Sequence, residues 1–270
     1  MKQMNKQLII LTICASAIFG LPQILFAEQL LEQGGLPKAV IVIDDLGNNM
    51  TGTEEMLNLP YPITVAIMPF LPSTKSDAEA AHRKGHDVIV HLPMEPLKGN
   101  RSWLGPGAIT CDLSDEEIRK RVNAAIDDVP HAIGINNHMG SKATVDERVM
   151  NIVLTVCHER GLFFLDSHTN YRSIVSKVAR QIGVPCIENH IFLDDIKNKK
   201  HVMKQLRLLQ QHLTEHEKCV AIGHVGAGGK GTAEVIKQVQ AQARDIEFVG
   251  ISKLIEGQGI QENPLQFHPN

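Results

Sequence analysis

Two adjacent carboxylates, Asp44 and Asp45, follow the apolar run at residues 39–43. At the tip of a buried strand such a pair is costly unless a metal, a proton or a partner neutralises it. One carboxylate could bind a metal while the other takes a proton. The alternative is an aspartate that caps the turn formed by the following residues 46–49. Strand tips are where active sites lie in strand–helix alternating proteins, so the pair is a candidate catalytic site.

Four other apolar runs resemble the first, because a histidine or an aspartate ends or closely follows each of them. These residues are His91, His138, Asp166, His168 and His224. A single histidine on an apolar strand is usually a core residue, but core histidines would not favour one end of the strands. The recurrence therefore favours a metal or acid–base site at one rim of a sheet.

Further polar and aromatic residues surround these strand ends. Glu95 lies four residues after His91, so that both side chains could reach one ion across a proline-bearing turn. The long loop at 92–113 is expected to shape a site, and its Trp103 could stack on a sugar or serve as a hydrophobic plug. The candidate substrate-binding residues are Asn136, Asn137, Asp166, His168 and Trp103.

Short apolar runs alternate with amphipathic segments from residue 36 onward. The expected strands are 38–44, 63–68, 87–91, 132–136, 162–166, 184–187, 219–223 and 246–251, and the expected helices are 114–130, 145–160, 197–216 and 232–243. This alternation implies parallel strands with right-handed crossovers. The strand count favours a single α/β domain with a closed or distorted (β/α) barrel, and an open doubly wound sheet is the alternative.

The two ends of the chain differ from its body. Residues 1–27 have a basic start and an apolar run ending at Ala27, which predicts a secretory signal peptide. An uncleaved membrane anchor is the alternative. Either interpretation places the body outside the cytoplasm, with a leader at 28–36, the barrel at 37–255 and a polar tail at 256–270. The net charge of −3 gives no electrostatic footprint for nucleic acid, and no stable protein partner is evident.

The motifs, taken in order, resemble those of the divergent polysaccharide deacetylases, distant relatives of the NodB-type carbohydrate esterases. The resemblance covers about residues 37–255 and rests on the segments 43–47, 91–95, 136–141, 166–167 and 223–224. It implies a distorted (β/α)7 barrel and a divalent metal, usually zinc. By the family pattern Asp44 is the general base, Asp45 and His91 are metal ligands, and His224 is the general acid.

Two departures from the family pattern matter. Glu95 stands where the family has a second metal-binding histidine, and an Asn-Asn-His segment replaces an arginine–proline motif. We therefore expect His138 to supply the missing nitrogen ligand, with Glu95 either ligating or orienting a water. The resemblance implies a secreted hydrolase that removes N-acetyl groups from a cell-wall or related polysaccharide. The alternative is a carbohydrate-binding or envelope-regulatory protein that keeps the barrel without catalysis.

Overall fold

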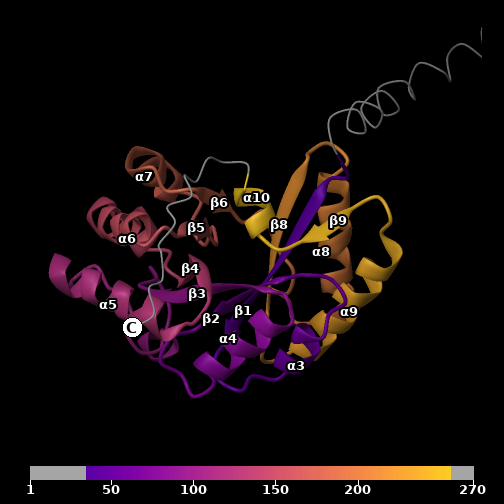
Figure 1. The fold of residues 1–270 in the computed structure, drawn as a ribbon, viewed down its shortest axis with the longest axis horizontal. Helices are drawn as coiled ribbons and strands as arrows, with labels where there is room; N and C mark the ends of the chain where they lie inside the picture. Colours follow the sequence, from indigo (N-terminus) through magenta and orange to yellow (C-terminus); the bar gives the residue numbers. More distant parts are fainter. Residues whose placement is uncertain (1–34, 257–270) are drawn as a thin grey trace, which may run out of the picture. The chain divides into compact units, whose positions relative to one another are not determined.

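A parallel sheet organises the part of the chain that the computed structural model describes, residues 35–256 (Figure 1). Its strands are β1 (Lys38–Leu46), β2 (Thr64–Ile67), β3 (Asp87–Met94), β4 (Ala132–Met139), β5 (Phe163–Asp166), β6 (Cys186–Glu188), β7 (Ile191–Phe192), β8 (Lys218–His224) and β9 (Glu247–Val249). They pair in the order β6-β5-β4-β3-β2-β1-β8-β7, and β9 also pairs with β1. Because the strands are parallel, their carboxyl ends lie along one rim.

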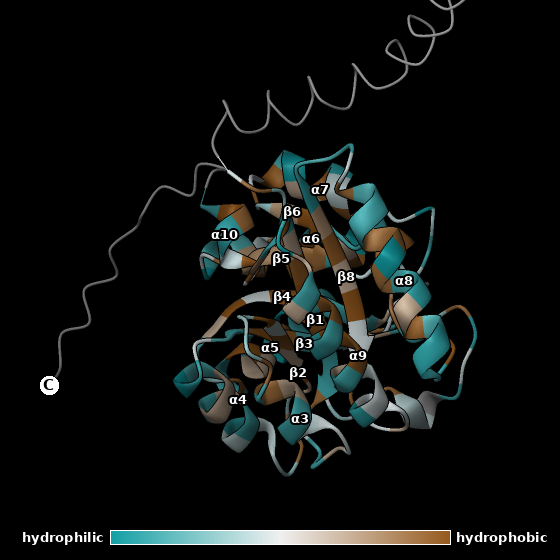
Figure 2. Ribbon diagram, turned by 90° about the vertical axis from the view of Figure 1, so that its right-hand side faces the viewer, coloured by the Kyte–Doolittle hydropathy of each residue, from teal (hydrophilic) through white to brown (hydrophobic). Residues whose placement is uncertain are grey.

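Helices cover the outer face of this sheet, except for the last, α10, which lies at its amino-terminal end. They are α3 (Thr53–Leu57), α4 (Thr74–Arg83), α5 (Asp115–Asp128), α6 (Glu147–Glu159), α7 (Val175–Ile182), α8 (Lys199–His212), α9 (Gly229–Gln242) and α10 (Ser252–Ile255), with 3-10 turns at η1 (Arg101–Trp103) and η2 (Ala143–Val145). Neighbouring helices pack in the series α5–α6–α7 and α8–α9–α3. Figure 2 shows mostly hydrophobic strands and helices whose hydrophilic residues mark their outer sides.

The sheet has a hydrophobic core on each of its faces. Alternate residues of β1 separate the two cores, because Ile41 and Ile43 pack under the helices while Val40 and Val42 face inward. The inner core includes aliphatic and aromatic residues from six further strands, β2, β3, β5, β6, β8 and β9. The sheet therefore curls around a filled interior. Because side chains alternate along a strand, Asp44, two residues after Val42, also faces inward.

The last helix stops the amino-terminal end of this interior. Ile251 N donates to Thr64 Oγ1 at 3.0 Å, and Ser252 N donates to Asp87 Oδ2 at 2.8 Å. Thr64 and Asp87 are the first residues of β2 and β3. Leu254, one turn further on, belongs to the inner core. Among the described residues, α10 thus covers this end of the interior.

The expectation of a distorted (β/α) barrel is confirmed, and the open doubly wound sheet is wrong. The distortion lies between β6 and β7, which end the pairing order and have no ladder between them among the described strands. Each expected strand overlaps an observed one, but β7, α3, α4, α7 and α10 were not predicted. Residues 1–34 and 257–270, with the expected signal peptide and most of the polar tail, lie outside the described range. Within residues 35–256, no helix has the length and apolarity needed to cross a bilayer.

Candidate metal and acid–base site

Three predicted residues, Asp44, His91 and His224, lie on the inward-facing side of their strands and meet at the carboxyl rim. Asp44 follows the inward-facing Val42 by two positions, and His224 follows Ile222 in the same way. His91 occupies the equivalent position on β3. Asp44 and His224 are also partners in the β1–β8 register. Side chains alternate along each strand and the parallel strands end at the same rim, so these three groups meet at the carboxyl end of the barrel, which we call its mouth.

Asp45 joins them because β1 departs from regular geometry. As the next residue after Asp44 it would point outward, but its φ of 69° lies in the left-handed region. The β1–β2 register also shifts between Ile43 and Leu46. Aspartate tolerates this conformation better than most residues, because its short side chain can bond locally. The backbone turn brings the second carboxylate to the same mouth as the first.

Asp45, His91 and His138 form a compact set of metal-ligand atoms, all within 4.8 Å of one another. Asp45 Oδ1 lies 3.3 Å from His91 Nε2 and 3.1 Å from His138 Nδ1, and the two nitrogens are 3.0 Å apart. Neighbouring ligand atoms around a tetrahedral zinc are about 3.3 Å apart, given bonds of about 2.0 Å. The separations therefore suit one shared ion.

Hydrogen bonds on the far side of each ring fix the two histidine tautomers. Asn136 donates through Nδ2 to Asp44 Oδ1 at 2.9 Å, so its oxygen accepts from His91 Nδ1 at 2.8 Å. The carbonyl of Trp103 can only accept, and it lies 3.1 Å from His138 Nε2. Both protons are thus directed away from the cluster.

The cluster consequently contains three facing electron-pair acceptors. His91 Nε2 and His138 Nδ1 present lone pairs, and Asp45 Oδ1 is buried without a hydrogen-bond partner among the described residues. Such an arrangement repels itself unless a proton or a metal cation lies between the three atoms. Burial lowers the pKa of His91, but the charge of Asp44 and the bond to Asp45 raise it above its usual value, so the cluster attracts positive charge. The donor set of two imidazoles and a carboxylate with an open fourth position is typical of catalytic zinc sites. These residues therefore fit a divalent metal.

Asp44 lies beside this cluster and remains almost fully buried, with 2% of its surface exposed. Burial raises the pKa of its carboxyl group above the usual value, although the nearby His91 and His224 oppose this effect. Its Oδ2 is 3.7 Å from His91 Nε2, and Asn136 holds its other oxygen. A buried carboxylate with a raised pKa and a fixed orientation can accept a proton at neutral pH.

His224 lies on the other side of Asp44 and is held by Asp194. Its Nδ1 is 2.7 Å from Asp194 Oδ1, and its backbone N donates to Oδ2 at 3.0 Å. Thr232 Oγ1 donates to the same oxygen at 3.1 Å. Burial alone would lower the pKa of His224, but the bond to Asp194 and the charges of Asp44 and Asp45 raise it to about 9. The imidazole is therefore a proton donor at neutral pH, with Nε2 left for a substrate.

Asp194 was not among the predicted site residues. It follows the two-residue strand β7, which is too short to stand out from hydrophobic pattern alone. The signal was nevertheless present, because Asp194 comes directly after the apolar residues 191–193, as the predicted aspartates and histidines follow their strands. Applying the same rule to shorter runs would have found it.

Glu95 lies outside the cluster, contrary to the expectation that it ligates metal or orients a water there. Its carboxylate forms an ion pair with Lys142 Nζ at 2.9 Å and accepts from Cys111 N at 2.8 Å. Burial opposes ionisation, but the bonds from Cys111 and Lys142 outweigh it and lower the pKa of Glu95. Glu95 thus fastens the loop after β3, and His138 takes the remaining place in the cluster.

Three of the five expected substrate-binding residues have other roles. Asn136 is fully buried and orients Asp44 and His91. Asn137 and Asp166 lie on the outward parity of their strands, where Asn137 accepts from Ser167 N at 2.9 Å and Asp166 accepts from Ser173 Oγ. Their polar atoms bond to the protein, so we no longer assign them to a substrate.

The other two expected substrate-binding residues remain exposed. His168 is exposed in the loop after β5. Trp103 has 68% of its surface exposed, which excludes the hydrophobic plug and leaves the stacking role as a prediction. Its backbone carbonyl already contacts the cluster through His138, so the indole belongs to a loop that borders the mouth.

Comparison with known proteins agrees with this arrangement. The sequence profile described as divergent polysaccharide deacetylase matches residues 41–255. This chain belongs to the divergent polysaccharide deacetylase family. The relatives of this deacetylase-family chain include an "Uncharacterized protein" of Haemophilus influenzae, 35% identical over 221 residues, which cover 80% of this chain and 76% of that protein. The "Uncharacterized protein YibQ" of Escherichia coli is 34% identical over 219 residues, covering 81% and 67%.

A solved structure supports the fold of this divergent polysaccharide deacetylase. The uncharacterized protein ATU2773 from Agrobacterium tumefaciens C58 superimposes with a TM-score of 0.76 at 21% sequence identity, covering 82% of this chain and 90% of that one. At this level of identity the likeness establishes the fold alone. The chemistry must therefore be argued from the residues of this chain.

Proposed function

We propose that this protein is an extracytoplasmic, metal-dependent hydrolase that removes N-acetyl groups from a cell-wall or related polysaccharide. The observation that carries the proposal is the set of three facing lone-pair atoms on Asp45, His91 and His138. A buried carboxylate and a protonated imidazole adjoin this set, which completes the groups that amide hydrolysis requires.

The residues divide the reaction between them. Asp45, His91 and His138 would hold a divalent ion, for which we expect zinc. When bound, the ion supplies a Lewis acid for the acetyl carbonyl and for the attacking water. Asp44 accepts the proton that the water loses, while Asn136 keeps its carboxylate in place.

His224 provides the complementary proton. As the carbon–nitrogen bond of the acetamido group breaks, His224 Nε2 donates a proton to the leaving nitrogen. The products are acetate and an amine, and the water is consumed. The pKa of about 9 keeps His224 protonated at neutral pH, and Asp194 stabilises that charge. Two groups with opposite proton loads at one pH are the pattern expected of an acid–base pair.

The alternative, a barrel that binds carbohydrate without catalysis, was motivated by the replacement at Glu95. The structure weakens that motive, because His138 completes a three-residue ligand set without Glu95. Three protein ligands and an open position are what a catalytic zinc site needs. We therefore rank hydrolysis first.

The test combines metal content with acetate release. The purified mature protein should hold about one zinc per chain by elemental analysis and should release acetate from chitooligosaccharide or peptidoglycan. The Asp44→Asn variant should keep the metal and lose turnover. A chain that takes up no transition metal and releases no acetate with zinc added would refute the proposal, and glycan binding without turnover would favour the binding protein.

A further inference from the structure

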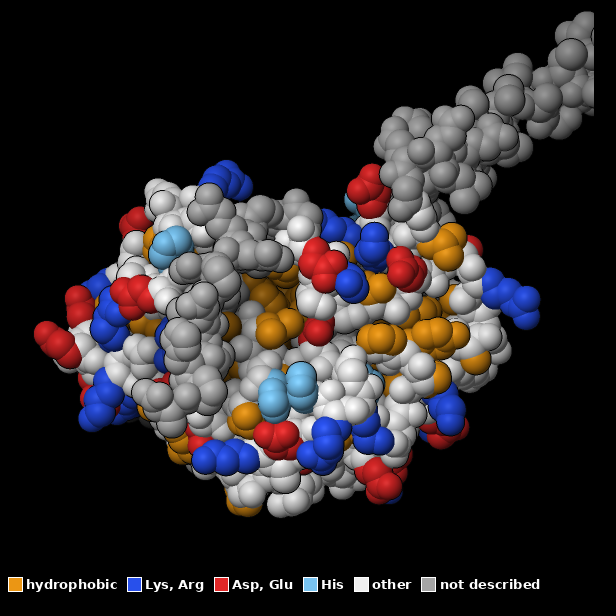
Figure 3. Space-filling view, in the orientation of Figure 1, with side chains coloured by type: hydrophobic (Ala, Val, Ile, Leu, Met, Phe, Trp, Pro, Cys, Tyr) orange, Lys and Arg blue, Asp and Glu red, His pale blue; other side chains and the backbone are white. Residues whose placement is uncertain are grey.

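A second charged region lies on α8 and the loop before it. Residues 197–207 contain no acid, and their cations are Lys197, Lys199, Lys200, Lys204 and Arg207, in a chain whose net charge is −3. Like charges that share a helix face at spacings of three and four destabilise the helix. Elsewhere the charges are mixed, and Figure 3 shows basic and acidic side chains interspersed on one face of the molecule. The segment is therefore unusual within this protein.

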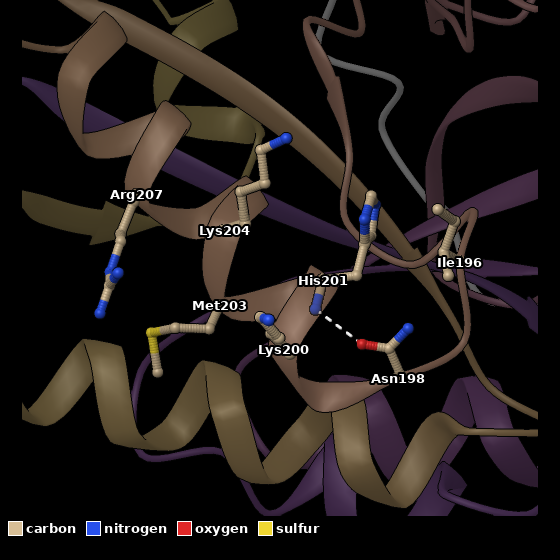
Figure 4. Close-up of a pocket in the computed structure, with 7 residues that line it drawn as sticks. All are labelled: Ile196, Asn198, Lys200, His201, Met203, Lys204 and Arg207. Carbon is tan, nitrogen blue, oxygen red and sulfur yellow. Dashed lines mark hydrogen bonds between the residues drawn. The ribbon is translucent and has the colours of Figure 1, made fainter.

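Three of these cations, Lys200, Lys204 and Arg207, line a pocket along α8 (Figure 4). The cavity has a volume of about 510 Å³ and is lined by Ile196, Asn198, Lys200, His201, Met203, Lys204 and Arg207. Neighbouring cations have anionic partners, since Lys199 pairs with Glu234 and His201 with Asp195. Within residues 35–256, the three pocket cations on α8 form no ion pair.

The pocket is connected to the candidate site along the chain. Ile196 follows Asp194 by two residues, and Asp194 holds His224. The stem of Lys197 lies against Gly228, where an added Cβ would be 3.3 Å from the Lys197 Cβ. Gly228 is four residues beyond His224 on the loop after β8. A ligand that contacts Ile196 therefore lies two residues along the chain from the carboxylate that holds the general acid.

We propose that this pocket binds a negatively charged group carried by the polysaccharide substrate. The inference rests on the proposed function, because it treats the pocket as a second contact of the same glycan. Lysine ammonium groups and a guanidinium suit carboxylate, phosphate or sulfate, and the arginine can form two parallel bonds. The exposed Ile196 and the neighbouring Met203 provide apolar contact for a sugar ring beside those charges.

An anionic membrane would attract the same cations, but the geometry favours a discrete anion. A bilayer offers a broad surface, whereas the three cations line a pocket of limited volume. The short path to Asp194 also connects the pocket to the reaction rather than to a remote surface. Lipid binding is therefore an outcome that the test must separate.

The test compares two oligosaccharides that differ in charge. Chitotetraose is neutral, and the N-acetylglucosamine–N-acetylmuramic acid tetrasaccharide has the same linkage with added lactyl carboxylates. Titration calorimetry with zinc-loaded Asp44→Asn protein avoids turnover. The anionic tetrasaccharide should bind about tenfold more tightly, and the preference should shrink in about 0.5 M NaCl. The Lys200→Ala/Lys204→Ala/Arg207→Ala variant should lose the preference and keep its affinity for chitotetraose.

A matched control removes three cations elsewhere. Lys120, Lys177 and Lys237 are exposed on α5, α7 and α9, so their replacement by alanine changes the net charge equally. This control should retain the preference. Equal affinities for the two tetrasaccharides, or an equal loss in both triple variants, would overturn the proposal. So would binding to vesicles with about 30% phosphatidylglycerol that needs the pocket cations while the tetrasaccharides are not distinguished.

Acetate release separates this inference from the proposed function. Wild-type protein and the pocket variant should release acetate from chitotetraose at equal rates, because the pocket does not contact a neutral glycan through charge. Turnover without charge preference would overturn the pocket proposal alone. Charge preference without turnover would overturn deacetylation and support the pocket as a site for anionic glycans.

Discussion

The two sides of Asp44 differ in how their polar atoms are satisfied. On one side, Asp45 Oδ1 is buried beside two imidazole nitrogens and accepts no hydrogen bond from the described residues. On the other side, both carboxylate oxygens of Asp194 accept bonds from His224 and Thr232. The hydrogen bonds between Asp194 and His224 fix the protonation state of that pair. Within residues 35–256, the cluster of Asp45, His91 and His138 lacks such bonds to Asp45 Oδ1 and can therefore accept an ion. The contrast assigns proton transfer to one side and metal binding to the other.

The largest expected effect on activity comes from removing a ligand from the cluster of Asp45, His91 and His138. His91→Ala removes one of three ligand atoms, so zinc content should fall from about one per chain to below about 0.1, with loss of acetate release. Elemental analysis after dialysis measures this. Glu95→Gln is the matched control and should retain zinc, because that carboxylate bonds to Lys142 and Cys111. Zinc retained by His91→Ala would contradict the assignment.

Replacing the group between the two sides should affect turnover without affecting metal. Asp44→Asn keeps the side-chain shape and removes the proton acceptor, so kcat should fall by about 10²–10⁴-fold. Zinc content should be unchanged, since Asp44 is outside the three-atom set. A joint measurement of kcat and zinc checks both statements. An Asp44→Asn enzyme with normal kcat would remove the general base from the mechanism.

The His224–Asp194 pair should determine how kcat/KM depends on pH. With its pKa at about 9, His224 is the protonated acid below that pH, so kcat/KM should decline as the pH rises through about 9. Asp194→Asn removes the bond and the charge that raise the pKa, so the decline should move to lower pH by about one to two units. Thr232→Val, which leaves the carboxylate in place, should move it much less.

The same pair predicts how stability changes with pH. A histidine whose pKa is raised in the folded state stabilises that state below its unfolded pKa of about 6.5. This contribution should disappear as the pH rises from about 6.5 through about 9. Denaturant unfolding of wild-type protein and Asp194→Asn over this range measures it. An identical pH dependence in both proteins would show that the pair does not contribute.

The smallest catalytic effect is expected outside the mouth. Asp166 ends β5 on its outward face, where it accepts from Ser173 Oγ and from His168 N. Asp166→Asn should leave acetate release within about twofold and lower the free energy of unfolding by about 1 kcal/mol. Kinetics together with urea unfolding tests this. A large loss of kcat at normal stability would place Asp166 in the reaction after all.

Sequence pattern predicted the strands well because most of them are apolar on both faces. The helix at α5 was also clear, because the serine and glutamate at 114 and 117 are typical of a helix start, and Ser114 Oγ accepts from Glu117 N at 3.2 Å. By contrast, α4 buries only Thr74, Ala78 and Ala81, which give a weak hydrophobic period. Its absence from the expected helices follows from that composition.

The sequence predicted the site residues that face the barrel interior better than it predicted the others. Asp44, Asp45, His91, His138 and His224 converge as the sequence predicts. Asn137 and Asp166 were expected in the site because they lie at the ends of their strands, yet side-chain alternation directs them to the other face. A turn of the strand tip at Asp45 was expected from the nearby Gly47, and the structure adds its left-handed φ of 69° and the register shift between Ile43 and Leu46.

The helix that closes the amino-terminal end has a consequence for substrate geometry. Since α10 blocks that end and apolar side chains fill the interior, a long glycan cannot thread through the barrel. Under the proposed function the polymer must lie across the rim and expose one acetamido group at a time. Acetamido groups within the glycan are then as accessible as those at its ends. The products should therefore include glycans that are deacetylated at internal sugars from the first turnovers.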